Sequence, residues 1–239
     1  MKGSGSAPAQ NQHTAESKQR ALLDCCGGLG NVDYSKLDFG FINLVLKHIS
    51  WSNSPFICSL ISILINSLLW ILVARWEHHT RALSRLFGSP YLACYSLGFV
   101  IILLNVLRSH SVTVAMKSQA RWLVMERMEV FYIGVALMVL GTVLVVSSFI
   151  ALGFTGTFLG DYFGLLMKEK VTCFPFSIIE NPMYWGSTAN YLGLALIGAS
   201  PAGLVLTVVV FVAYKVAISF EGPFTEQIYL QRHQHHKHD

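Results

Sequence analysis

The sequence predicts an all-α, polytopic membrane protein with about four hydrophobic helices. Of its 239 residues, 53% are hydrophobic and only 13% are charged, whereas soluble domains carry about 25% charged residues. Several uncharged runs are also long enough to cross a bilayer, which takes about 20 residues of helix. The net charge of +4 is modest and is spread along the chain, so the composition indicates a membrane and no nucleic-acid partner.

The composition divides the chain into three parts. Residues 1–50 form an amino-terminal extension whose beginning is rich in Gly, Ser, Gln and Asn, a composition typical of disorder. Within it, residues 37–49 fit a linker better than a short amphipathic helix. Residues 51–222 form the membrane domain, and residues 223–239 form a polar carboxy-terminal tail.

Four apolar segments of the membrane domain are expected to be spans or intramembrane segments: about 54–74, 87–107, 135–155 and 199–219. The first would be about 31 Å long as a helix, which is enough to cross. Asn66 and three serines weaken it, so a re-entrant segment remains an alternative to a full span. Pro90 stands early in the second segment, where a helix tolerates proline. Glycines interrupt the chain after the third.

The last apolar region allows two arrangements. No Asp, Glu, Lys or Arg occurs from Asn181 to Tyr214, which is more chain than one crossing needs. Pro201 and Gly203 interrupt this run, and they predict a hairpin of two helices. A hairpin would bring Tyr184 and Glu221 to one face of the membrane. The alternative is one long span, 199–219, with these two residues on opposite faces.

Two motifs identify a family. The segments NPMYWG at 181–186 and EGPFTE at 221–226 resemble the phosphatidylethanolamine N-methyltransferases and, more distantly, the integral-membrane methyltransferases that include the isoprenylcysteine carboxyl methyltransferases. The match covers nearly all of 75–229, and DCCGGLG at 24–30 resembles the extended amino terminus of the long form. The resemblance implies an enzyme that converts phosphatidylethanolamine to phosphatidylcholine by three sequential N-methylations, with S-adenosyl-L-methionine as the methyl donor.

The resemblance also implies a set of donor-binding residues. The Gly-x-Gly motif of the family falls on Val139, Leu140 and Gly141, where Val139 departs from the pattern. Its pair of adjacent glutamates falls on Glu221 and Gly222, where Gly222 departs from it. The implied cofactor-binding residues are Val139, Leu140, Gly141, Asn181, Tyr184, Glu221 and Gly222. Without the resemblance, Gly141 indicates helix packing and Glu221 indicates an ordinary charge at a helix end.

Aromatic residues accompany the first of the two motifs. In the related membrane methyltransferases a His-Pro-x-Tyr-x-Gly segment lies against the donor, and here Asn181 replaces the histidine. The rings of Tyr184, Trp185 and Tyr191 would suit a cationic sulfonium or methylated amine, each cation–π contact contributing about 0.5–2 kcal/mol. The alternative is that these rings belong to the aromatic belt found at membrane interfaces.

The amine must lose a proton before it can attack the methyl group. Asp161 and Glu180 are the candidate catalytic residues and rank above His110, although each also fits an ordinary loop charge. Lys215 is expected to extend its ammonium toward the interface. The five cysteines contain no CxxC pair, so the sequence predicts no metal site.

Charge does not decide the orientation of the chain in the membrane. The polar loops at 75–85 and 108–129 carry the same net charge, so the positive-inside rule is tied. The resemblance implies a multi-pass protein of the endoplasmic reticulum, and also of mitochondria-associated membrane, with a cytosolic carboxyl tail and a bilayer phospholipid as substrate. The oligomeric state stays open. A non-catalytic lipid-binding or scaffold protein of the same fold is the alternative, kept open by Val139 and Gly222.

Overall fold

The computed structural model describes residues 40–167 and 171–235. The chain divides into two units, Met1–Asn43 and Leu44–Asp239, and each is treated separately here. The match at 24–30 and the disorder expected at the amino terminus lie outside the described residues.

The first described element is helix α2, Gly40–Lys47, whose opening residues belong to the first unit. A helix therefore forms where the sequence favoured a linker, and that preference was wrong for this stretch. Val45 on this helix and Ile49 just after it are buried, which explains why a short segment of mixed composition becomes ordered.

All the regular secondary structure in the described residues of the second unit is helical. Its helices are α3 (Ser54–Thr80), α4 (Ala82–Leu86), α5 (Pro90–Lys117), α6 (Met128–Thr157), α7 (Pro182–Ile197) and α8 (Pro201–His235), with the short 3-10 helices η3 (Leu123–Met125) and η4 (Gly160–Phe163). Within the described part of the chain, 4 helices are long and apolar enough to cross a membrane. The predicted all-α membrane fold is confirmed, and the chain is a multi-pass membrane protein.

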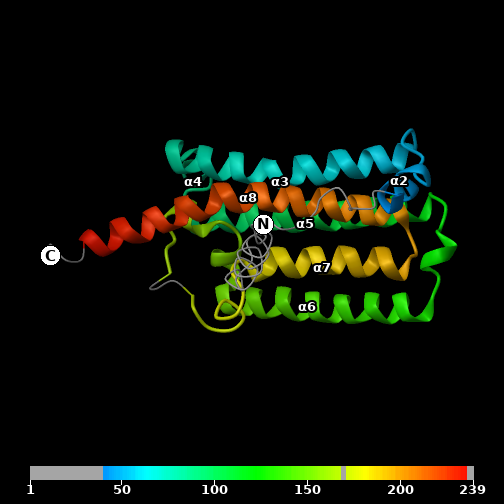
Figure 1. Cartoon of the computed structure of the whole chain (residues 1–239). Helices are drawn as coiled ribbons and strands as arrows, with labels where there is room; N and C mark the ends of the chain where they lie inside the picture. The colour runs from blue at the N-terminus through cyan, green and yellow to red at the C-terminus, as the bar shows by residue number, and fades with distance from the viewer. Residues whose placement is uncertain (1–39, 168–170, 236–239) are drawn as a thin grey trace, which may run out of the picture. The chain divides into compact units, whose positions relative to one another are not determined.

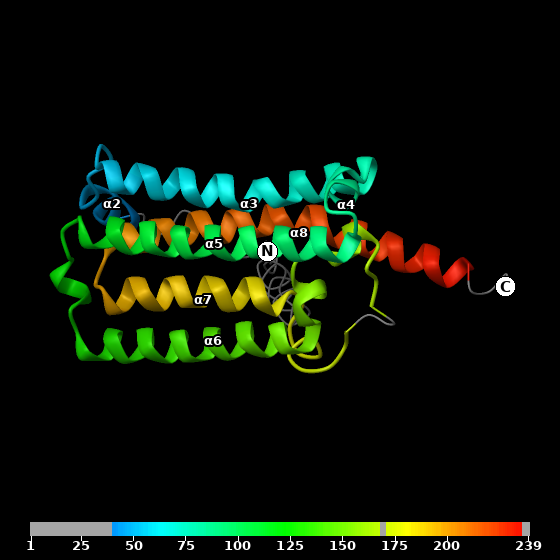
Figure 2. The same cartoon turned by 180° about the vertical axis from the view of Figure 1, so that it is seen from behind.

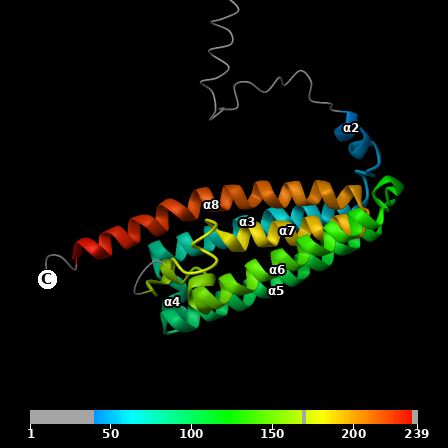
Figure 3. The same ribbon diagram turned by 60° about the horizontal axis from the view of Figure 1, so that its bottom comes forward.

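The long helices of this unit lie side by side and alternate in direction (Figure 1). Helix α8 packs between α3 and α7, while α5 packs on α3 and α6 packs on α7. One end of the bundle carries α4, η4 and the start of α7, and the other carries η3 and the turn between α7 and α8, as the view from behind also shows (Figure 2). We call these the α4 end and the η3 end. Helix α8 continues past the α4 end (Figure 3).

Helix α3 is continuous from its cap to its end. The side chain of Asn53 accepts a hydrogen bond from the amide of Phe56 at 3.2 Å, which satisfies a free donor of the first turn. Two of the polar residues that weakened this segment donate hydrogen bonds inside the bundle: Ser67 donates to a backbone carbonyl, and Nδ2 of Asn66 donates to Asn105 of α5 at 2.9 Å. Oδ1 of Asn66 is buried without a hydrogen-bond partner among the described residues. The re-entrant alternative is therefore wrong, because an unbroken helix accommodates these groups.

Helix α5 is longer than predicted. It continues to Lys117, so the polar loop expected at 108–129 begins only at Ser118. Residues 108–117 contain no glycine or proline, and Val112, Ala115 and Met116 are buried against the core at helical spacing. Packing of this face extends the helix beyond the apolar run.

The carboxy-terminal hairpin is present. Helices α7 and α8 run antiparallel and in contact, and the single long span is wrong. In the turn, Ala199 adopts a left-handed φ of 45°, and its carbonyl accepts the amide of Trp122 at 2.9 Å. The hydroxyl of Ser200 accepts the amide of Gly203 at 3.1 Å. These bonds satisfy backbone groups that the break would otherwise leave without partners.

The hairpin predicts a labelling pattern. Each test protein carries one cysteine: either the native, exposed Cys173 or a cysteine in place of Gln227 of α8. We expect both proteins to react with an impermeant maleimide from the same side of sealed microsomes. A cysteine at Lys117, at the η3 end, should react only after detergent is added. The three proteins share a background without other cysteines. Labelling of Cys173 and Gln227 from opposite sides would contradict the hairpin.

Candidate functional site

The hairpin joins the two sequence motifs through a side-chain contact. The hydroxyl of Tyr184, near the start of α7, donates a hydrogen bond of 2.6 Å to Oε2 of Glu221 on α8. The two residues are 37 positions apart in the sequence, and a single straight helix would have held them about 55 Å apart. The antiparallel arrangement thus places an aromatic ring and a carboxylate together at the α4 end.

Local backbone geometry positions Tyr184. Asn181 precedes α7 with a left-handed φ of 55°, a conformation that asparagine tolerates better than most residues. Pro182 then occupies the first helical position, where its missing N–H costs nothing. The carbonyl of Asn181 accepts the amide of Tyr184 at 3.1 Å. The Asn181 side chain makes no capping bond and is exposed.

Glu221 has the electrostatic character of a site for a cation. Its carboxylate accepts a hydrogen bond from Tyr184, and it forms no ion pair with any described residue. A carboxylate enclosed in an apolar bundle without a cationic partner is costly. A bound cation would offset that cost, and the Tyr184 ring beside it offers a cation–π surface.

A buried arginine supports this pair from deeper in the bundle. Arg108 of α5 is only 5% exposed and donates to the Tyr214 hydroxyl at 2.7 Å. Its guanidinium lies 5.5 Å from the centroids of the Tyr191 and Tyr214 rings. The Tyr214 ring in turn lies 4.9 Å from that of Tyr184. A continuous chain of contacts therefore runs from Arg108 through two tyrosines to Glu221.

The candidate bases differ in their surroundings. Asp161 lies in η4 at the α4 end, where Tyr229 of α8 donates a hydrogen bond to it. Glu180 is exposed and precedes Asn181 in the turn before α7. His110 is exposed in the half of α5 nearer the η3 end, away from the Tyr184–Glu221 pair. The fold thus brings Asp161 and Glu180 to the end of the bundle that carries the Tyr184–Glu221 pair. His110 lies away from that end.

The Gly-x-Gly positions lie at a helix contact. Val139 and Leu140 are 60% and 56% exposed and face away from the bundle. Gly141 is buried, and a Cβ there would stand 2.5 Å from the carbonyl oxygen of Gly186 and from Oδ1 of Asn190. Gly141 therefore permits α6 and α7 to approach closely. A role for Val139, Leu140 and Gly141 in donor binding stays a prediction.

Gly222 lies in the open. It is exposed, and a Cβ there would meet no atom within 4 Å. The space around it would accept the second glutamate of the family pattern without a clash. The departure at Gly222 therefore removes a carboxylate and not a packing contact, and its predicted role in donor binding is untested.

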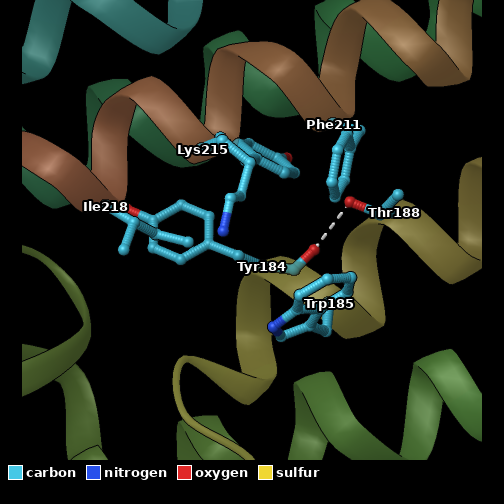
Figure 4. Close-up of a pocket in the computed structure, with 7 residues that line it drawn as sticks. Tyr184, Trp185, Thr188, Phe211, Lys215 and Ile218 are labelled. Carbon is cyan, nitrogen blue, oxygen red and sulfur yellow. Dashed lines mark hydrogen bonds between the residues drawn. The ribbon is translucent and has the colours of Figure 1, made fainter. Parts of the chain in front are cut away.

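A small, shallow pocket lies between α7 and α8 beside this site, lined by Tyr184, Trp185, Thr188, Phe211, Tyr214, Lys215 and Ile218. Figure 4 shows the Lys215 side chain pointing toward Tyr184 and Trp185, with Thr188 donating to the Tyr184 carbonyl at 2.9 Å. The Lys215 ammonium repels a second cation in this pocket. Tyr184 and Trp185 both line this pocket, and the cation–π role predicted for each of them stays a prediction.

Sequence reasoning missed several residues of this region. Arg108 and Arg75 were taken as loop charges, and Tyr162 and Tyr214 were not singled out. One signal was available for Arg108. No glycine or proline follows it up to Lys117, so the apolar helix before it could continue and carry the arginine into the bundle. Ionisable residues within membrane helices face the bundle interior and mark functional sites.

The comparisons with known proteins agree on one class. The family model described as phospholipid methyltransferase matches residues 130–232. The chain is 57% identical over 188 residues to phosphatidylethanolamine N-methyltransferase of Homo sapiens and 56% identical to that of Rattus norvegicus, in each case over 79% of this chain and 94% of the relative. It is 41% identical to phosphatidyl-N-methylethanolamine N-methyltransferase of Saccharomyces cerevisiae, over 80% of this chain and 93% of the relative. No solved structure matches.

Fold and site together define a multi-pass membrane enzyme with a carboxylate–tyrosine pair at one end of a helical bundle. The chain belongs to the phospholipid methyltransferase family.

Proposed function

We propose that this protein methylates phosphatidylethanolamine and its mono- and dimethyl derivatives to give phosphatidylcholine, with S-adenosyl-L-methionine as methyl donor. The observation that carries the proposal is the Tyr184–Glu221 hydrogen bond. This bond joins the two motifs that resemble the family. The sequence alone also allowed these motifs to lie on opposite faces of the membrane. The relatives carry phosphatidylethanolamine or phosphatidyl-N-methylethanolamine in their names as substrates, and nothing favours the non-catalytic alternative.

The residues at the α4 end fit this donor chemically. When bound, S-adenosyl-L-methionine supplies a methyl group on a cationic sulfur, which the neutral acceptor amine takes as the carbon–sulfur bond breaks. Glu221 offers an unpaired carboxylate to a cationic or hydroxyl group, and Tyr184 offers its ring. Asn181 precedes the same helix as Tyr184, and its side chain makes no capping hydrogen bond, so its amide is available to the donor. We assign these three residues to the donor.

The chain must also hold the acceptor amine and take up its proton. Asp161 and Glu180 are the carboxylates we assign to proton removal, and Asp161 is the better placed, since the Tyr229 hydroxyl orients it. General-base catalysis needs the carboxylate within hydrogen-bond reach of the amine, directly or through one water. The acceptor would enter the α4 end laterally, with its acyl chains still in the bilayer.

The donor is water-soluble, so the α4 end should face the compartment that contains it. We propose that this compartment is the cytosol and that the membrane is that of the endoplasmic reticulum, including regions associated with mitochondria. The carboxyl tail would then be cytosolic, because α8 leaves the bundle at the α4 end.

The test is a methylation assay. Membranes that express this chain are incubated with S-adenosylmethionine labelled in its methyl group, and phospholipids are extracted and separated. We expect label in mono-, di- and trimethylated phosphatidylethanolamine. Binding of the donor to the purified protein is measured in parallel. Donor binding without lipid labelling would contradict the proposed substrate, and absence of both would contradict the proposed function.

A further inference from the structure

Arg75 stands next to the candidate donor site without an anionic partner. It lies in the last turns of α3, where its Nη2 donates to the Phe220 carbonyl at 3.2 Å and its guanidinium lies 5.1 Å from the Phe220 ring centroid. Phe220 immediately precedes Glu221 on α8. Arg75 forms no ion pair with any described residue, and its Nε is buried without a hydrogen-bond partner among them.

A second buried donor accompanies it. Tyr162 of η4 is only 1% exposed, and its hydroxyl donates to no acceptor among the described residues, although its oxygen interacts with the neighbouring Arg75 side chain. The ring is held by stacking on Phe224 at 3.9 Å and by an edge contact with His78 at 6.4 Å. The hydroxyl lies within electrostatic range of both Arg75 and Glu221. Tyr162 thus connects the guanidinium to the carboxylate site.

These donors define the chemistry of a ligand. Buried polar groups are almost always hydrogen-bonded, and one that is not implies a missing partner. Nε of Arg75 and the Tyr162 hydroxyl are donors without an acceptor among the described residues, while Nη2 of Arg75 already donates to the Phe220 carbonyl. The missing partner should therefore be an anion with more than one acceptor oxygen. A phosphodiester fits, since two of its oxygens match the planar fork of arginine.

We propose that Arg75 and Tyr162 bind the phosphate of the acceptor phospholipid, an assignment that rests on the proposed function. In phosphatidylethanolamine only a two-carbon link separates phosphate and amine. A phosphate held beside Phe220 therefore places the amine next to Glu221 and Tyr184, where methyl transfer would occur. Arg75 would act as an acceptor-binding residue with no part in holding the donor.

Lys215 is the competing cation. It is exposed and lines the pocket between α7 and α8. Water can therefore accept the hydrogen bonds of its ammonium group, which needs no lipid phosphate as a partner. It also lies six residues before Glu221, about 9 Å nearer the middle of the helix bundle. The phosphate of a membrane lipid stays at the level of the headgroups. Arg75 follows the apolar part of α3 and therefore lies near that level. These two differences favour Arg75.

The experiment measures acceptor and donor separately in the full-length protein in detergent micelles. Arg75→Gln is expected to raise the KM for dihexanoylphosphatidylethanolamine about 10- to 100-fold, the loss expected for charge-assisted hydrogen bonds. The Kd for S-adenosylmethionine should stay within about twofold, which also shows that the variant is folded. Arg75→Lys keeps the charge without the fork and should lose less.

A ligand comparison identifies the phosphate as the recognised group. Dihexanoylphosphatidylmethanol has the phosphodiester and no amine, and dihexanoylglycerol has neither. As competitors of the acceptor, the first should inhibit the wild type far better than the second, and Arg75→Gln should remove that difference.

Two matched variants make the test specific. Arg85→Gln removes an exposed charge at the same end of the bundle, and Lys215→Met removes the competing cation. Both should leave the preference for phosphatidylmethanol intact.

Equal losses of this preference in Arg75→Gln and Arg85→Gln would indicate a general attraction of anionic lipid and would overturn the proposal. Loss of the preference in Lys215→Met alone would also overturn it. A weaker donor Kd with an unchanged acceptor KM in Arg75→Gln would place Arg75 with the donor instead. A wild type that binds donor and methylates no lipid contradicts the proposed lipid substrate, on which this assignment rests.

Discussion

Glu221→Ala is expected to abolish binding of S-adenosylmethionine. The carboxylate has no ion-pair partner among the described residues and is held toward Tyr184, so a cationic donor would depend on it. Removing one member of a buried charged pair costs about 2–4 kcal/mol, which weakens binding by a factor of about 30 to 1,000. Equilibrium binding of labelled donor to the purified protein measures the loss.

Two variants accompany this measurement. Glu226→Ala removes an exposed glutamate from the same helix and should bind donor like the wild type. Tyr184→Phe keeps the ring and removes the 2.6 Å hydrogen bond, so its loss should be smaller, about 1.5–3 kcal/mol. Unchanged donor affinity in Glu221→Ala would remove Glu221 from the site and leave it as a charge at the membrane interface.

Gly141→Leu is expected to disrupt the fold. A Cβ at this position would already stand 2.5 Å from the Gly186 carbonyl oxygen, and a Cβ at Gly186 would in return stand 2.7 Å from the Gly141 carbonyl oxygen. A leucine would force α6 and α7 apart, and overpacking by even small groups costs about 1–3 kcal/mol. We expect a lower yield of folded protein and a clearly lower Tm in detergent.

The same α6 segment supplies the control. Val139→Leu places the same side chain two residues away on an exposed surface and should leave Tm unchanged. Val139→Gly, which restores the family pattern, should cost at most about 1 kcal/mol and keep or improve donor affinity. A Gly141→Leu protein with normal Tm would show that α6 and α7 do not pack as described. Normal donor binding in that protein would also exclude this helix from the donor site.

Apolar runs and breakers were sufficient to predict most of the helices. Runs of uncharged residues located the spans, because a helix in lipid must satisfy its own backbone hydrogen bonds. Pro201 correctly marked the break between α7 and α8, whereas Gly203 lies inside α8, packed against α7. The ends were less accurate: α5 continues ten residues past the predicted 107, to Lys117, because burial of Val112 and Met116 outweighs the polar character of the segment.

The motifs likewise identified individual residues but not their neighbours. Tyr184 and Glu221 were predicted from short motifs, and both were expected to serve one donor if the chain turned back. Whether it turns back depended on contacts far apart in the sequence, such as the bond from the Trp122 amide to the Ala199 carbonyl. Spacing along the chain carries no information about such contacts.

The sequence by itself determined that this chain is a membrane protein of the phospholipid methyltransferase family, because composition, apolar length and motif identity are properties of the chain alone. Tertiary structure decided which polar groups meet. Only packing shows that Gly141 serves the contact with α7 and that Arg108 lies among tyrosines. Packing likewise shows that Nε of Arg75 and the Tyr162 hydroxyl are buried without acceptors among the described residues. The physical reason is that the energy of a polar group depends on its burial and its partners, and both are set by helices distant in sequence.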